Sequence, residues 1–349
     1  MGRDFFQHSS TPADIGSGSD ERQLLSLVIP CFNEEEALRE TNKRLVTALE
    51  HSHQGFEIIY VDDGSTDSTR EVLRELQARD LRVRVVRFSR NFGHQVAITA
   101  GIEHAGGHAV IILDADLQDP PEVIPQFVAK WLDGYDVVYG VRSERDGETP
   151  FKRWTAKFFY RLMGHLSDAP IPVDTGDFRL MDRRVVNAML SMPERDRFVR
   201  GMVSWLGFSQ IGVPYRREAR IAGVTKFSLF KMIRFALDAI FSFSTLPLRL
   251  ATWVGFAASG LSIMGILVIL LDKYLGVPGM VKGWTSTVIA VLFIGGVQLI
   301  CLGIIGEYVG RIYGESKRRP LYVVRERLGF DAQAKPVPRI LRSKAAASR

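Results

Sequence analysis

Two aspartates, Asp114 and Asp116, follow directly after the apolar run VIIL, which has the composition of a buried strand. Their alternate positions direct both carboxylates the same way. With the amide of Gln118 nearby, they form half of a site for a hard cation such as Mg²⁺ or Mn²⁺, whose other ligands are phosphate and water oxygens. The pattern predicts a nucleotide-diphosphate substrate. The alternative is that these acidic residues only end the strand and cap the helix beginning at Pro121.

Two further strand ends carry polar residues. The run FEIIYV precedes Asp62 and Asp63, and the run LLSLVIP precedes a turn that contains Phe32. The segment from Asn33 to Glu36 has the pattern of a capping box for the next helix. Because ligands of open α/β sheets bind outside the carboxyl ends of the strands, we expect the three turns to converge on one binding edge.

The segments between these turns alternate between helical and strand patterns, which predicts a mainly parallel, doubly wound α/β sheet. No GxGxxG follows a strand and no GxxxxGK[ST] occurs, so the fingerprints of dinucleotide oxidoreductases and P-loop NTPases are missing. Phosphate must then be held by a metal and by cationic side chains. We expect helices near 35–50, 67–79, 93–105 and 121–133, and strands near 83–88, 109–113 and 136–140.

Residues 250–271 and 283–306 contain no charged side chain. As helices they would be about 33 and 36 Å long, enough for a hydrocarbon core of about 30 Å, so two transmembrane helices are predicted. The alternative is a buried helical hairpin in a soluble domain. From 307 to 349 there are eleven Lys or Arg and four Asp or Glu. The positive-inside rule therefore places this tail, and with it the catalytic domain, in the cytoplasm.

Two segments have the pattern of helices that lie on a membrane surface. Residues 151–163 form a basic amphipathic pattern, and residues 226–243 have a narrow polar stripe. Packing of both segments on the globular core is the alternative. The chain has 45 basic and 39 acidic residues, with the excess in the tail and juxtamembrane segments. Anionic lipid headgroups explain this excess, so no nucleic-acid partner is expected.

The motifs, taken in order, resemble those of the polyprenyl-phosphate glycosyltransferases of glycosyltransferase family 2, relatives of dolichyl-phosphate mannose synthase. They are VIPCFNEEEAL, VDDGSTDST, SRNFGHQVAITAG, LDADLQDPPEVIP, VDTGDFRLMDR and AGVTKFS, followed by two apolar spans and GEYVGRIY. SRNFG, SFSTLPLR and GGVQLI are similar to the bactoprenol glucosyltransferase branch. The likeness covers about residues 24–325 and is much less specific to the sugar than to the family.

The resemblance implies a GT-A domain and an inverting, metal-dependent transfer of one sugar, most simply glucose from a UDP-sugar donor, to undecaprenyl or another polyprenyl phosphate. It also implies a homo-oligomer, a tetramer in relatives, at the plasma membrane. Mannose, aminoarabinose or N-acetylhexosamine donors stay open. Matched by position, the site residues are Pro30, Phe32, Glu34, Val61 and Asp63 around the nucleoside; Asp114, Ala115, Asp116 and Gln118 around metal and diphosphate; and Arg142, Arg220 and Lys226 on phosphate.

The chemistry requires little proton transfer, because a phosphomonoester is already largely ionised near neutral pH. Asp177 is the base candidate implied by the resemblance, but this argument favours an orienting role; a simple turn residue is the alternative. Arg153 and Arg217 are expected near the acceptor phosphate, unless they belong to a solvated basic face. Two other functions are alternatives to single-sugar transfer: a processive polysaccharide synthase and a catalytically inactive membrane scaffold.

The expected organisation follows from these patterns. It comprises a disordered lead at 1–22, a cytoplasmic GT-A domain at 23–225, a juxtamembrane helix at 226–247, a two-helix transmembrane module at 248–306 and a basic cytoplasmic tail at 307–349.

Overall fold

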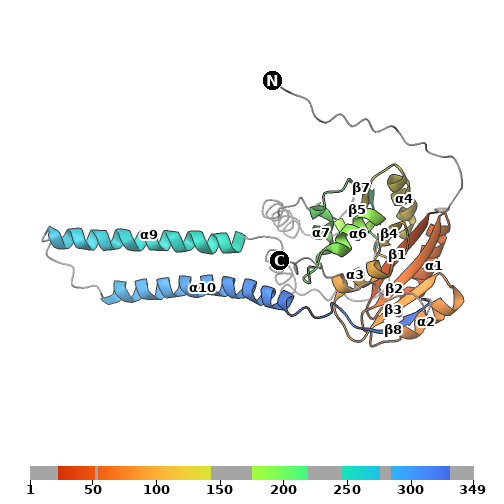
Figure 1. Cartoon of the computed structure of the whole chain (residues 1–349), viewed down its shortest axis with the longest axis horizontal. Helices are drawn as coiled ribbons and strands as arrows, with labels where there is room; N and C mark the ends of the chain where they lie inside the picture. Colours follow the sequence, from red (N-terminus) through yellow and green to blue (C-terminus); the bar gives the residue numbers. More distant parts are fainter. Residues whose placement is uncertain (1–22, 52–53, 143–174, 219–245, 276–283, 331–349) are drawn as a thin grey trace, which may run out of the picture.

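A computed structural model describes residues 23–51, 54–142, 175–218, 246–275 and 284–330. These residues form one eight-stranded sheet flanked by helices, and a helical hairpin that projects from it (Figure 1). The strands are β1 (Leu24–Cys31), β2 (Gly55–Asp62), β3 (Val83–Phe88), β4 (Ala109–Ile112), β5 (Val137–Arg142), β6 (Thr175–Asp182), β7 (Gln210–Tyr215) and β8 (Val324–Leu328). The helices are α1 (Leu38–Glu50), α2 (Thr69–Arg79), α3 (His94–His104), η1 (Pro121–Val123), α4 (Ile124–Leu132), α6 (Arg183–Ser191), α7 (Val199–Trp205), α9 (Leu246–Tyr274) and α10 (Trp284–Ser316).

The sheet has the order β7-β5-β6-β4-β1-β2-β3-β8. Strands β4, β1, β2 and β3 are neighbours and parallel, which confirms the predicted mainly parallel α/β sheet. The strand order reverses at β1, because β2 lies on one side of it and β4 on the other. This reversal brings the carboxyl ends of β1, β2 and β4 together at one edge of the sheet, where open α/β sheets bind their ligands.

Strand β6 runs against this direction. It pairs antiparallel with β4, and Ile112 is opposite Arg179. Continuing that register past the end of β4 places Asp177 across from Asp114. The first residues of β6 therefore reach the same edge at which the parallel strands end. A local reading of the sequence could not foresee this, since the segment that connects β5 to β6 gives no sign of where the chain returns.

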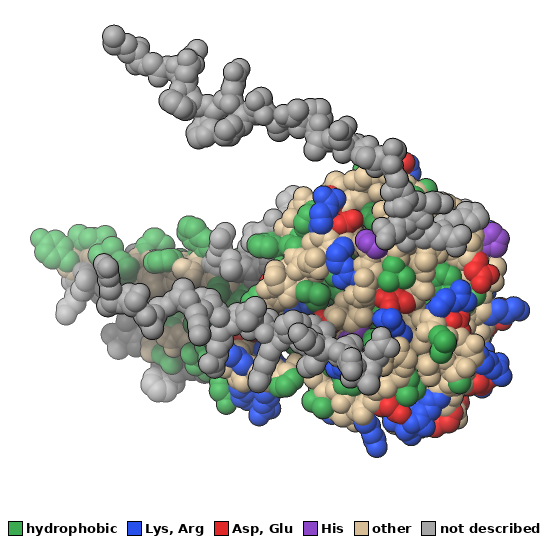
Figure 2. All heavy atoms as spheres, turned by 45° about the vertical axis from the view of Figure 1, so that its right-hand side comes forward, with side chains coloured by type: hydrophobic (Ala, Val, Ile, Leu, Met, Phe, Trp, Pro, Cys, Tyr) green, Lys and Arg blue, Asp and Glu red, His purple; other side chains and the backbone are tan. Residues whose placement is uncertain are grey.

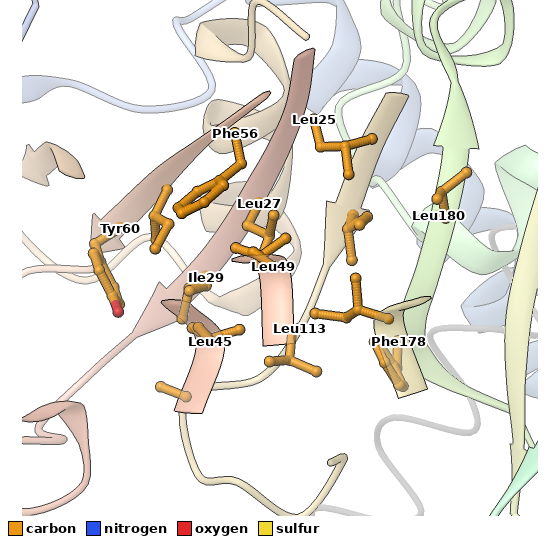
Figure 3. Close-up of a cluster of buried hydrophobic side chains, with 14 of the residues drawn as sticks. Leu25, Leu27, Ile29, Leu45, Leu49, Phe56, Tyr60, Leu113, Phe178 and Leu180 are labelled. Carbon is orange, nitrogen blue, oxygen red and sulfur yellow. The ribbon is translucent and has the colours of Figure 1, made fainter. Parts of the chain in front are cut away.

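The core occupies both faces of the sheet. Helices α1, α2 and α4 cover one face, and helices α3, α6 and α7 cover the other. Figure 3 shows side chains of β1, β2, β4 and β6 meeting those of α1 on the first face. On the second face α3 lies very close to β1, because a Cβ on Gly101 would be 2.1 Å from Val28 Cγ1. This close contact holds α3 against the sheet. The first residues of α3 are thereby held at the binding edge.

Helices α9 and α10 form the projecting hairpin (Figure 1). Among the described residues, one helix is long and apolar enough to cross a membrane, over Phe293–Ser316 of α10. The apolar stretch of α9, Leu250–Gly265, is shorter. The second predicted span therefore stays a prediction. Hydrophobic side chains such as Trp253 and Leu299 are exposed along the hairpin (Figure 2), and so large an exposed apolar surface is typical of contact with lipid or another protein.

After α10 the chain returns to the sheet. β8 pairs antiparallel with β3. Glu326 in β8 forms ion pairs with Arg70 and Arg74 of α2. Tyr322 stacks on Phe88 with ring centroids 4.8 Å apart. Helix α10 continues past residue 306 to Ser316. Charged residues dominate VRERL, as is common in edge strands, so its sequence does not resemble a buried strand.

Several predicted features lie outside the described residues. These are the lead at 1–22, the amphipathic segment at 151–163, most of the juxtamembrane segment at 226–247, and residues 331–349 of the tail. The domain boundaries drawn from the sequence stay predictions.

Candidate active site

The turns after β1 and β2 are joined by side-chain to backbone hydrogen bonds. Asn33, with a positive φ of 57°, donates its N–H to Ser65 Oγ at 3.0 Å and accepts at Oδ1 from the N–H of Thr66 at 2.9 Å. The predicted capping box is therefore wrong: α1 begins at Leu38 without a side-chain cap, and Asn33 instead holds the neighbouring turn. Phe32 protrudes at this edge with 42% of its surface exposed.

The two aspartates at the end of β2, Asp62 and Asp63, have different contacts. Asp62 is fully buried and accepts from the Ser65 N–H at 2.8 Å and from Arg87 Nε at 3.0 Å. Asp63 is also buried, and its two oxygens accept the N–H groups of Phe92 at 2.6 Å and Gly93 at 2.9 Å. Burial raises the pKa of Asp63, although these backbone hydrogen bonds oppose the shift. Asp63 therefore fixes the loop that leads into α3.

The other nucleoside-pocket candidates lie close to these turns. Pro30 and Val61 face each other in the register of β1 and β2, and both are buried near the ends of their strands. Glu34 follows the first turn, where its N–H donates to Thr69 Oγ1 at 2.9 Å. The structure thus gathers Pro30, Phe32, Glu34, Val61 and Asp63 around two adjacent strand ends. Their contact with a nucleoside stays a prediction.

The turn after β4 holds Asp114, Ala115 and Asp116. Within this turn Leu117 has a positive φ of 56°, and the N–H of Gln118 donates to Asp116 Oδ1 at 3.2 Å. The alternative that these acidic residues cap the following helix is not supported, because η1 begins without a side-chain cap. A left-handed leucine that is completely buried stores backbone strain, which is common at functional turns.

Asp114 has one buried oxygen to which no described residue donates a hydrogen bond. Its Oδ1 is buried and has no hydrogen-bond partner within the described part of the chain, while His94 Nε2 lies 3.6 Å away. Burial raises the pKa of Asp114 to about 6; His94 opposes the shift, and three nearby carboxylates add to it. A buried acceptor without a donor is costly unless a cation or ligand completes it.

This orphaned oxygen makes the turn a suitable partner for a divalent cation. Asp114 and Asp116 supply hard oxygen ligands, but the described residues contain no group of three or more His, Cys, Asp or Glu that could hold a metal by itself. In the predicted half-site the remaining ligands would come from substrate and water, and this stays a prediction. Gln118 fits less well in this conformation, because its Oε1 accepts a hydrogen bond from Arg217.

Asp177 lies inside β6 rather than in a turn, so the alternative of a simple turn residue is wrong. Arg200 donates from Nε to its Oδ1 at 2.8 Å and from Nη2 to its Oδ2 at 3.2 Å. The Nε2 atoms of His94 and Gln95 lie 3.2 and 3.3 Å from Oδ2. Burial alone would raise the pKa of Asp177, but His94 and Arg200 outweigh it and hold the pKa far below its usual range.

His94 connects the two acidic positions. Its Nε2 is within reach of both Asp177 and Asp114. Burial lowers the pKa of His94, but the hydrogen bond to Asp177 and the charge of Asp114 outweigh it and raise the pKa to about 9. The imidazole therefore carries a positive charge at neutral pH in this arrangement, between the two carboxylates.

Arg142 reaches the site from the end of β5. Its Nε donates to Tyr215 Oη at 3.4 Å, and Tyr215 in turn donates to Asp119. The guanidinium lies over Gly176, where a Cβ would be 2.9 Å from Arg142 Nη2. A side chain at position 176 would therefore require the Arg142 guanidinium to move.

The structure brings most predicted site residues to one edge of the sheet, but Arg153, Arg220 and Lys226 lie outside the described residues. Sequence reasoning missed the roles of His94, Gln95, Arg200, Tyr215 and Asp119. The SRNFGHQ motif, which contains His94 and Gln95, stands out in the sequence but gives no indication of their contacts. Arg200 gave no signal, because it lies in a short helix whose sequence shows nothing of its partner on β6.

Comparison with known proteins shows the family of this chain. Residues 26–190 match the family described as glycosyl transferase family 2, and residues 246–312 match the GtrB C-terminal hairpin. A bactoprenol glucosyl transferase of Shigella phage SfV is 43% identical over 86% of this chain and 98% of its own length. The uncharacterized glycosyltransferase YkcC of Bacillus subtilis is 47% identical over 88% of this chain and 94% of its own length.

Solved structures show a more distant likeness. Glucosyl-3-phosphoglycerate synthase from Mycobacterium tuberculosis, in complex with Mn²⁺, uridine diphosphate and phosphoglyceric acid, is 19% identical with a TM-score of 0.44. The match covers 63% of this chain and 76% of that one. The sequence matches, by contrast, extend over nearly the whole of both chains. This chain therefore belongs to glycosyltransferase family 2 and is a glycosyltransferase with a GT-A fold, homologous to bactoprenol glucosyl transferases.

Proposed function

We propose that this enzyme transfers a single sugar, glucose from UDP-glucose, to undecaprenyl or a related polyprenyl phosphate. The observation that carries the proposal is the meeting of two unlike acidic positions at one sheet edge. The turn after β4 has a carboxylate oxygen without a hydrogen-bond partner among the described residues, and Asp177 across from it is already paired with Arg200. The first suits a cation with a diphosphate, and the second suits a neutral sugar or a hydroxyl.

The donor would lie across the ends of β1, β2 and β4. Phe32 is the exposed aromatic side chain at this edge, and an aromatic face gives a nucleobase a stacking surface. Asp63 holds the loop before α3 by two backbone hydrogen bonds, so the wall of the pocket is built before the donor arrives. Preformed walls reduce the entropy lost on binding.

Asp114 and Asp116 would hold Mg²⁺ or Mn²⁺ together with oxygens of the donor diphosphate. When bound, the cation supplies positive charge that neutralises the departing nucleoside diphosphate. Arg142 would add to that charge from β5, since its guanidinium lies above Gly176 at the start of β6. Arg217, now held by Gln118, is placed to do the same if that contact opens.

In the transfer, an oxygen of the acceptor phosphate attacks the anomeric carbon, and the bond from that carbon to the diphosphate oxygen breaks. A single displacement of this kind inverts the anomeric configuration. The attacking oxygen needs no base, because a phosphomonoester has lost most of its second proton near neutral pH. Asp177, whose pKa is held low by its neighbours, would be a weak base in any case. Its role would be to orient the acceptor or the sugar.

A lipid acceptor gives a reason for the hairpin. Removing a polyprenyl chain from the bilayer would cost about 0.8 kcal/mol for each CH₂ exposed to water. An enzyme attached to the membrane avoids that cost. The end of α10 lies against the catalytic domain through Arg311 and Asp196, 3.2 Å apart, so a membrane-embedded hairpin would hold the domain near the surface.

The orientation follows from the charge distribution. The cationic excess after residue 306 favours a cytoplasmic position for the tail and catalytic domain, with two crossings between them. The inner membrane and a homo-oligomer belong to the same proposal. Small residues along α10, such as Gly295 and Gly303, permit close contact between helices.

The test uses membranes that contain the full chain, undecaprenyl phosphate and labelled UDP-sugars. We expect a product that is extracted into organic solvent, carries one sugar, forms best from UDP-glucose and disappears when a chelator is added. A polymeric product would favour a processive synthase, and no product from any donor would favour a non-catalytic scaffold. Efficient transfer from another UDP-sugar in place of UDP-glucose would correct the choice of donor.

A further inference from the structure

The carboxylate of Asp177 is held from three sides. Arg200 forms a two-pronged pair with it, and His94 and Gln95 contact Oδ2 from the start of α3. The side chain of Asp177 is only 5% exposed, whereas that of Arg200 is 26% exposed. The carboxylate therefore cannot rotate without breaking several charge-assisted hydrogen bonds.

Arg200 is itself placed by a connected set of contacts. It is the second residue of α7, and the first residue of that helix, Val199, donates its N–H to Gln95 Oε1 at 2.9 Å. The amide nitrogen of the same Gln95 lies 3.3 Å from Asp177 Oδ2. One glutamine thus joins the beginning of α7 to the carboxylate that Arg200 binds. The Arg200 guanidinium also lies 5.9 Å from the centre of the Phe198 ring.

Arginine is the side chain suited to this task. Its planar fork matches both oxygens of a carboxylate, so the pair fixes an orientation as well as a distance. A lysine would keep the charge but would lose one of the two prongs. The geometry therefore sets the direction in which Asp177 faces the turn that contains Asp114.

We propose that Arg200 is the positioning residue of Asp177, and that its contribution to sugar transfer passes through that carboxylate. Gln95 supports it by joining α7 to β6. The inference rests on the proposed function, in which Asp177 orients the acceptor or the sugar. The competing arrangement is direct binding of the acceptor phosphate by Arg200. The two differ in whether the effect of losing Arg200 survives the loss of Asp177.

The experiment is a double-mutant cycle on the full chain in detergent or nanodiscs, with UDP-glucose and undecaprenyl phosphate. The variants are Arg200→Gln, Asp177→Asn and the two together, with kcat and both KM values measured. We expect Arg200→Gln to lower kcat about 10- to 100-fold, because a small misplacement of a catalytic group has effects of this size. The double variant should lie within about twofold of Asp177→Asn, since the two changes remove one interaction.

Two further variants sharpen the cycle. Arg200→Lys should recover part of the lost kcat, because it keeps the charge without the fork. Arg184→Gln is the matched control: it removes an arginine that pairs with Asp136 and Asp182 at the opposite end of β6. That control should leave kcat within about twofold of the unmodified enzyme, as exposed ion pairs contribute little.

Two results would overturn the proposal in favour of direct phosphate binding. One is a loss of kcat in the double variant equal to the product of the two single losses. The other is a raised KM for the acceptor with unchanged kcat in Arg200→Gln. The thermal unfolding temperatures of the same four proteins test the contact without turnover. Coupling between the two sites supports the pairing, whereas additive shifts overturn it. If the unmodified chain transfers no sugar to lipid phosphate, the proposed function fails, and the unfolding cycle still decides whether Arg200 holds Asp177.

Discussion

Asp114 and Asp177 lie at the same edge of the sheet but in opposite electrostatic surroundings. Asp114 follows β4, has an oxygen without a hydrogen-bond partner among the described residues, and has its pKa raised to about 6, mainly by burial. Asp177 belongs to β6 and is paired with Arg200 and His94, which hold its pKa low despite burial. Asp114 has the more distant His94 near it, 3.6 Å away, whereas Asp177 binds both His94 and Arg200 directly.

The difference shows how two aspartates in one site divide the work. A carboxylate without enough cationic neighbours gains most from a ligand that brings charge, such as a metal with a diphosphate. A carboxylate that already has its cations gains nothing from a second charge and serves to hold geometry. The surroundings, and not the residue type, separate the two roles.

The largest effect is expected in the turn after β4, which contains Asp114 and Asp116. Asp116→Ala should lower transfer by about a thousandfold, because charge on the leaving diphosphate would no longer be neutralised. Initial rates with labelled donor measure this, and membrane fractionation checks that insertion is intact. Asp133→Ala, which removes an exposed carboxylate paired with Lys130, is the control. Full transfer by the enzyme in excess chelator would take the metal out of the mechanism.

A smaller effect is expected at the cation-rich position. Asp177→Asn should lower kcat by about 10- to 100-fold through loss of orientation. Because its pKa is depressed, the carboxylate stays ionised between about pH 5 and pH 8, so the pH profiles of variant and parent should run parallel. Recovery of the variant's rate at high pH alone would instead identify Asp177 as the base.

The same depressed pKa has a consequence for stability. A carboxylate with a lower pKa in the folded state contributes stability above its unfolded value of about 3.9, and that contribution is lost as the pH falls further. In acid-unfolding curves monitored by fluorescence, Asp177→Asn should therefore flatten the loss of stability below about pH 4. An unchanged acid slope would mean that the Arg200 pair does not persist in solution.

Phe32, unlike Asp114 and Asp177, lies on the side of the site where the nucleoside is expected to bind. Phe32→Ala should raise the KM for the nucleotide donor by about tenfold without changing the KM for the lipid, since base stacking contributes about 1–3 kcal/mol. Phe32→Tyr keeps the ring and should be close to the parent enzyme. Donor titrations at saturating acceptor provide the measurement, and an unaffected donor KM in Phe32→Ala would remove the aromatic ring from the pocket.

The smallest effect concerns the link between the hairpin and the Asp177 side. Arg311→Gln breaks the contact with Asp196, which is 62% exposed, so kcat should change by about twofold or less. Arg39→Gln, which breaks an ion pair with Glu75 far from the hairpin, is the matched control. A loss above about tenfold in Arg311→Gln alone would show that α10 controls the placement of α7 and its Arg200.

Much of the parallel half of the sheet could be read from the sequence. Apolar runs such as FEIIYV predicted buried strands. The helices between these strands begin and end within a few residues of their predicted positions. The capping box at Asn33 was wrong, because its amide satisfies a neighbouring turn and not its own helix. The strand β8 was missed, because an edge strand rich in charge has no apolar pattern.

The candidate site could be predicted only in part from the sequence. The aspartates at the ends of β2 and β4 are conspicuous in the sequence, because both groups begin where an apolar run ends. Their different contacts could not be predicted from the sequence. Asp62 and Asp63 are adjacent, yet Asp62 binds Arg87 and Asp63 binds the loop before α3. Arg200 was unforeseeable for a related reason: its meaning depends on a carboxylate that belongs to another element.

The sequence by itself determined the acidic turn after β4, the parallel strands and the apolar lengths of the hairpin, because periodicity and strand ends are local properties of the chain. Only the tertiary structure decided that Asp177 faces Asp114 and is held by Arg200 and His94, which are 23 and 83 residues away from it. The protonation and orientation of a buried carboxylate depend on which charges and dipoles surround it in space, and those neighbours are assembled only when β6 pairs with β4.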